Sequence, residues 1–207
     1  MLRSSNFVRG ALVLMMLGFS TLAPAAPLTQ SDFRGDMRKL WEDHITWTRV
    51  YIIDAVADLP SKPATTQRLL KNQSDIGGAI TPFYGEAAGT KLAALLKDHI
   101  VIAAELIDAA KAGQTAKKDD AAKRWGTNAD EIATFLSGAN PKNWPAADMK
   151  KHMHDHLDLT TAEVVARLNK DWAGDIAAYD KVHEQILHMA DMLSTGIITQ
   201  HPAKFAR

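Results

Sequence analysis

The sequence predicts an all-α fold, an antiparallel helical bundle of four to five long helices plus one short helix. Apolar residues recur at spacings of three and four through most of the chain, which is the period of one face of a helix. No stretch alternates between apolar and polar residues as a half-buried strand does. The prolines that follow the first 25 residues fall between the periodic segments, at Pro27, Pro60, Pro63, Pro82, Pro141, Pro145 and Pro202.

These boundaries define the helices in order. The first long helix is expected from Ser31, as N-cap, to Asp58, with Pro60 as its stop. A short helix near 65–71 and a loop containing Gly77, Gly78 and Pro82 are expected next. Four further long helices are expected at about 85–112, 116–137, 145–169 and 171–199.

The first 25 residues have the features of a secretory signal peptide that is cleaved. Arg3 and Arg9 supply the positive start, residues 10–17 are apolar, and Ala23-Pro24-Ala25 is an A-x-A cleavage site. The apolar run is shorter than the ~20 residues that a membrane-spanning helix needs. We therefore expect a periplasmic or secreted mature chain, 26–207, that forms one helical-bundle domain without a membrane span. This mature chain has 22 basic and 24 acidic residues.

Composition excludes several functions. The 207 residues include no Cys, which excludes disulfides, cysteine-bound metal clusters, thiol catalysis and covalent c-type haem. The whole chain balances 24 basic against 24 acidic residues, so nucleic acid is not a predicted partner. Phosphate-binding loops and nucleophile-elbow motifs are missing. Glu-x-x-His and His-Glu-x-x-His are missing too, which argues against a di-iron carboxylate centre and a metalloprotease.

A short motif is repeated near the middle of three predicted helices. It reads Asp43-His44-Ile45, Asp98-His99-Ile100 and Asp155-His156-Leu157, and the last two copies are 57 residues apart, roughly one helical hairpin. The pattern suggests two similar hairpins preceded by the first helix.

Four histidines are expected to face the core. His44, His99 and His183 lie at the centre of the apolar face of their helices, and His156 lies at the edge of one, beside His152 and Glu163. Each of the four is near the midpoint of its helix, so antiparallel packing would bring them to one level. A buried imidazole without a partner costs about 1–3 kcal/mol, so the four histidines need a common explanation.

Three explanations remain open. The first is a transition-metal site for copper, zinc, nickel or iron, used for storage, buffering or sensing rather than catalysis. Its predicted ligands are His44, His99, His156 and His183, with Glu163 and His152 in reserve. The second is b-type haem held between helices. The third is a polar core layer in an envelope-associated structural or protein-interaction bundle, with a homo-oligomer or an envelope protein as partner. His188 is expected on a polar helix face near Asp191. This face is either solvated or forms a surface metal site.

The stretch Leu40-Trp41-Glu42-Asp43-His44-Ile45-Thr46-Trp47-Thr48-Arg49 resembles the opening of a group of small, secreted, all-helical bacterial proteins. The similarity extends to the stretches around Asp98-His99 and Ala190-Asp191-Met192. This resemblance implies a helical bundle and brings no catalytic activity with it.

Overall fold

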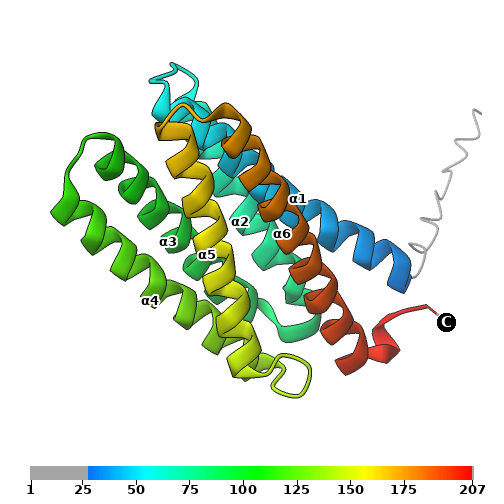
Figure 1. Cartoon of the computed structure of the whole chain (residues 1–207). Helices are drawn as coiled ribbons and strands as arrows, with labels where there is room; N and C mark the ends of the chain where they lie inside the picture. Colours follow the sequence, from blue (N-terminus) through cyan, green and yellow to red (C-terminus); the bar gives the residue numbers. More distant parts are fainter. Residues whose placement is uncertain (1–27, 207) are drawn as a thin grey trace, which may run out of the picture.

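The computed structural model describes residues 28–206 and is a bundle of six long helices (Figure 1). No strand occurs in this range, so the prediction of an all-α bundle is confirmed. The predicted signal peptide lies outside the described residues. The helices are α1 (Gln30–Val56), α2 (Lys62–Tyr84), α3 (Glu86–Lys111), α4 (Thr115–Ala139), α5 (Ala146–Leu168) and α6 (Trp172–Gln200), followed by the short 3₁₀ helix η1 (Pro202–Lys204).

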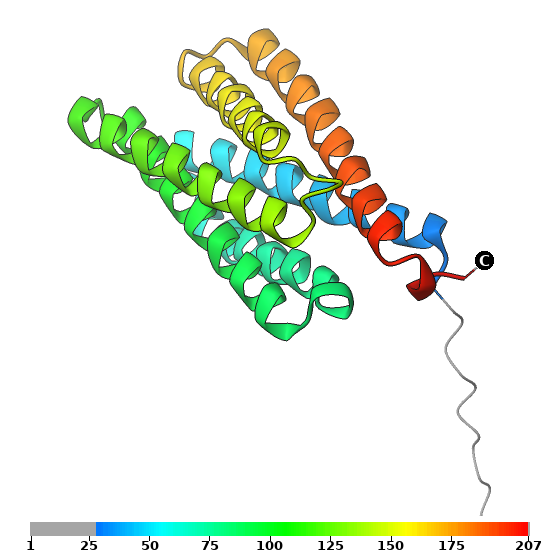
Figure 2. The ribbon, with the colours of Figure 1, turned by 90° about the horizontal axis from the view of Figure 1, so that it is seen from below.

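The six helices form a closed ring. Each packs against the next along the chain, and α6 returns to pack against α1 (Figures 1 and 2). Because short loops join antiparallel neighbours, α1, α3 and α5 run in the same direction. Helix α1 also contacts both α3 and α5, so these helices approach one another across the inside of the ring. The two ends of the described chain meet where the Ala206 N–H donates to the Leu28 carbonyl at 2.8 Å.

The segment 61–83 differs from its prediction, because it forms the full-length helix α2 rather than a short helix and a loop. Gly77 does not break the helix and instead lets α3 approach closely. A Cβ built on Gly77 would lie 2.6 Å from the Gly89 carbonyl oxygen. Pro82 lies in the last turn, and Gly85, with a φ of +86°, then separates α2 from α3.

This longer α2 makes the internal repeat threefold. Residues 30–200 form three helical hairpins, α1–α2, α3–α4 and α5–α6, and each has the Asp-His motif in its first helix. Core residues recur at matched distances from the three histidines. Seven residues before each lie Met37, Leu92 and Met149, and eight residues after each lie Ile52, Ile107 and Val164, all of them buried.

None of the helices in residues 28–206 is long and apolar enough to span a membrane.

Candidate functional site: a cluster of three buried histidines

Three of the four predicted core histidines meet inside the ring. His44, His99 and His156, here called the histidine cluster, come from α1, α3 and α5 and are only 3–4% exposed. The centroid of the His156 imidazole lies 5.9 Å from that of His44 and 6.2 Å from that of His99. The cluster is therefore formed by the same position of all three repeats.

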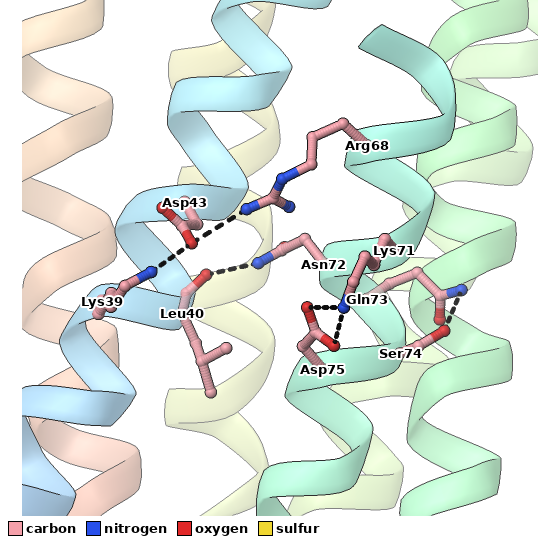
Figure 3. Close-up of polar contacts among 9 residues, drawn as sticks. All are labelled: Lys39, Leu40, Asp43, Arg68, Lys71, Asn72, Gln73, Ser74 and Asp75. Atoms are coloured by element: carbon pink, nitrogen blue, oxygen red, sulfur yellow. Dashed lines mark hydrogen bonds and ion pairs between the residues drawn. The ribbon is translucent and has the colours of Figure 1, made fainter. Parts of the chain in front are cut away.

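The second helix of each hairpin supplies a carboxamide beside the histidine. In all three hairpins the amide nitrogen donates to the backbone carbonyl four residues before the histidine, and Figure 3 shows the first of these bonds crossing from α2 to α1. The bonds run from Asn72 to Leu40 at 2.9 Å, from Asn128 to Leu95 at 3.1 Å and from Gln185 to His152 at 3.0 Å.

These bonds assign the tautomers of two imidazoles. Because the Asn128 nitrogen donates to a carbonyl, its Oδ1 faces His99 Nδ1 at 2.9 Å and accepts a hydrogen bond from the Nδ1–H. Gln185 Oε1 faces His156 Nδ1 at 3.3 Å in the same way. In both residues the basic nitrogen is then Nε2. His99 Nε2 is buried and has no hydrogen-bond partner among the described residues.

The first hairpin is less tightly paired. The equivalent atoms are His44 Nδ1 and Asn72 Oδ1, and within residues 28–206 both are buried without a hydrogen-bond partner. Asn72 is near enough to oppose the fall in the pKa of His44, but the two atoms do not meet in hydrogen-bond geometry. Unpaired buried polar atoms of this kind cost about 1–3 kcal/mol each.

Burial keeps the histidine cluster neutral. It lowers the pKa of His44 and of His99 to about 3 and that of His156 to about 4. The charge of a protonated His156 would lower the pKa of its two neighbours further, whereas the carboxamides act in the opposite direction. All three imidazoles are therefore in the neutral form, which is the form that binds metals.

A cavity of about 30 Å³ adjoins the histidine cluster. Thr160 and Trp125 line it, and in the described part of the chain neither Thr160 Oγ1 nor Trp125 Nε1 has a hydrogen-bond partner. The volume suits an ion or one to two water molecules. Pockets for drug-sized ligands measure about 300–1,000 Å³, so this cavity does not admit the macrocycle of b-type haem.

Glu163, a predicted reserve ligand, belongs to a different group. Its Oε1 accepts from Arg49 Nη1 at 2.7 Å, and Arg49 also binds Asp175 at 2.9 Å. Asp175 is bound in turn by Arg167 at 3.1 Å, which completes a charged cluster of four residues. Burial raises the pKa of Glu163 to about 7 although Arg49 opposes this. The carboxylate is thus bound within the charged cluster and does not join the histidines.

His183 is not in the histidine cluster, contrary to its prediction. Its side chain is 36% exposed, and its Nε2 lies 2.9 Å from Glu42 Oε1. Ile176, two turns before His183 and on the same side of α6, is 56% exposed. The buried face of α6 is rotated toward Val182, Ile186 and Met189.

His152 also lies outside the histidine cluster. It is one turn before His156 and only partly buried, and its ring centroid is 5.5 Å from that of His188.

The imidazoles of the histidine cluster lie slightly farther apart than imidazoles that share one metal ion. In residues 28–206 no group of three or more His, Asp or Glu side chains is arranged to hold a metal ion as it stands. Imidazoles that share one ion with bonds of about 2.0–2.1 Å have centroids about 5–5.5 Å apart. The separations of His156 from His44 and from His99, 5.9 and 6.2 Å, exceed the upper end of this range by about 0.4 and about 0.7 Å.

The carboxamides should contribute measurably to stability. In Asn128→Leu the buried His99 Nδ1–H loses its acceptor, and we expect the free energy of unfolding to fall by about 1–3 kcal/mol in urea denaturation. Asn169→Leu, at an exposed asparagine, is the control and should change it by less than about 0.5 kcal/mol. Equal effects of the two substitutions would contradict the assigned bond.

No protein-family model matches the chain, and comparisons with curated proteins and with solved structures found no similar protein.

Proposed function

We propose that this protein binds one transition-metal ion, copper, zinc, nickel or iron, through Nε2 of His44, His99 and His156. The observation that carries the proposal is the buried Nε2 of His99, which has no hydrogen-bond partner within residues 28–206 while its Nδ1–H is held by Asn128. Histidines that ligate metals usually donate their other ring N–H to such a partner, which orients the ring. Gln185 holds His156 in the same way.

The donor set determines the class of ion. Three neutral imidazoles suit zinc, copper, nickel and iron, whereas magnesium and calcium require oxygen ligands. The cavity beside the cluster has room for a water molecule as a fourth ligand. An ion at the cluster would also bind His99 Nε2, which is otherwise buried without a partner in the described part of the chain, so binding is expected to stabilise the fold.

Storage, buffering or sensing fits this site better than catalysis. The three histidines are almost fully buried, and a cavity of about 30 Å³ leaves no space for an organic substrate beside the ion. We place this function in the periplasm or outside the cell, because residues 1–25 have the features of a signal peptide.

One observation favours a second candidate, a polar core layer in an envelope-associated structural or interaction bundle. His99 and His156 already donate to fixed carboxamides, which accounts for one nitrogen of each ring without an ion. In this case the partner would be an envelope protein or a second copy of the chain.

Metal titration distinguishes the two candidates. The purified protein is stripped with a chelator and titrated separately with Cu²⁺, Zn²⁺, Ni²⁺ and Fe²⁺ in competition with a chromophoric chelator, so that only tight sites are detected. We expect one equivalent of at least one ion to bind with a Kd below about 1 µM, or about −8 kcal/mol. His99→Gln should abolish this binding, and His183→Gln, the same change outside the cluster, should preserve it.

Circular dichroism of each variant serves as the control that it remains helical. Absence of tight binding for all four ions, or unchanged binding in a folded His99→Gln variant, would contradict the metal proposal and favour the polar core layer.

A further inference from the structure

His152 on α5 and His188 on α6 form a pair on the outer side of their hairpin, here called the surface pair. Their ring centroids are 5.5 Å apart and the ring planes are inclined by 49°. His188 is exposed and His152 is partly buried. Imidazoles bound to one ion have centroids about 5–5.5 Å apart, so the surface pair is closer to this separation than the histidine cluster is.

The backbone around the surface pair is held in place. Gln185, one turn before His188 on α6, donates from Nε2 to the carbonyl of His152 at 3.0 Å. This bond ties α5 to α6 at the level of the two imidazoles. A pair that is already in position loses less conformational entropy when it binds a ligand.

Acidic and basic groups both surround the surface pair. Burial lowers the pKa of His152, and the neighbouring His188 and Lys151 lower it as well, whereas Asp155 and Asp148 act in the opposite direction. Asp191 interacts electrostatically with His188. Arg38 binds both carboxylate oxygens of Asp191.

We propose that His152 and His188 form a second metal site, at the surface, for a divalent transition-metal ion such as Cu²⁺, Ni²⁺ or Zn²⁺. With two protein ligands, the ion would keep water at its other positions, so the site is weaker and exchanges faster than one with three buried imidazoles. Affinity should follow the general order for divalent ions, with Cu²⁺ strongest. This site does not depend on the histidine cluster, because it shares no ligand with it.

The test is calorimetric titration of the protein with Ni²⁺ alone at pH 7.5, without a competing chelator. We expect a class of one site with a Kd above about 1 µM, in addition to any tight site. His188→Gln should weaken this class at least tenfold and leave tight binding unchanged. His154→Gln is the matched control, because His154 is an exposed histidine on α5 that faces Asp130 instead.

A second readout is the NMR signal of the imidazole protons. In the His99→Gln variant, which lacks the tight site, substoichiometric Ni²⁺ should broaden the His152 and His188 resonances before that of His154. The proposal is overturned if His188→Gln binds Ni²⁺ as the unchanged protein does, or if His154→Gln weakens the class equally. Because the two sites differ in affinity and in ligands, loss of the weak class alone and loss of the tight site alone are distinguishable.

Discussion

Metal-free protein should lose about 6 kcal/mol of stabilisation from the histidine cluster when the pH falls from 7 to 5. Burial lowers the pKa of the three histidines to about 3, 3 and 4, whereas their unfolded-state pKa is about 6.5. Below pH 6.5 the unfolded chain therefore binds protons that the folded chain does not. Each histidine stabilises the fold above pH 6.5 and loses about 2 kcal/mol of this effect by pH 5.

Glu163 partly offsets this loss. Its pKa is raised to about 7, so the folded state binds a proton before the unfolded state as the pH falls. This gain amounts to about 2 kcal/mol between pH 7 and pH 5. The net expected fall in the free energy of unfolding is therefore about 4 kcal/mol, a large share of the 5–15 kcal/mol typical of a domain.

Urea denaturation at pH 7 and pH 5, in the presence of a chelator, measures this fall. In His99→Gln it should be smaller by about 2 kcal/mol, because one titrating group is removed. His183→Gln, a substitution of a partly exposed histidine, should retain the full fall. If all three proteins lose the same stability between the two pH values, the three histidines are not buried as neutral groups.

The second large effect is expected at the charged cluster. Arg49→Met leaves the buried carboxylates of Glu163 and Asp175 without their shared cation, and only Arg167 remains bound to Asp175. Removing one partner of a buried ion pair costs about 3–5 kcal/mol. The loss should be greatest above pH 7, where Glu163 is ionised, and smaller at pH 5, where it is protonated.

Denaturation of Arg49→Met at pH 8 and pH 5 tests both the size and the pH dependence of this loss. Arg38→Met is the control, because Arg38 forms an ion pair with Asp191 at the exposed surface. Its effect should be much smaller, since exposed ion pairs contribute little. Equal losses in the two variants would show that the charged cluster is not buried as described.

Much of the fold follows from local sequence. Helical periodicity and the positions of proline and glycine place five of the six long helices to within a few residues. The prediction is wrong at 61–83, where Gly77 and Gly78 indicate a loop. In the structure Gly77 lies within a helix and allows the close approach of α3. The distinction depends on a neighbouring helix, which no local pattern describes.

The histidine cluster was partly predictable. The Asp-His repeats identify His44, His99 and His156, which the structure brings together. His183 was wrongly predicted to face the core, because a wheel gives the periodicity of a helix but not its rotation within the bundle. The partners of Arg49 were unpredictable for the same reason.

The carboxamides were missed although the sequence contains a signal for them. Asn72, Asn128 and Gln185 follow the three histidines by 28, 29 and 29 residues. This spacing has a meaning only if the chain contains three hairpins. Because 61–83 was predicted as a short helix and a loop, the first hairpin was not recognised.

X-ray absorption spectroscopy of the protein loaded with one equivalent of the ion that it binds most tightly tests the proposed metal centre most directly. Binding through the histidine cluster predicts three imidazole nitrogens at about 2.0–2.1 Å from the ion. His99→Gln should lose one imidazole from this shell or fail to retain the ion. A shell of two or fewer imidazoles, or an unchanged shell in His99→Gln, would contradict a three-histidine centre.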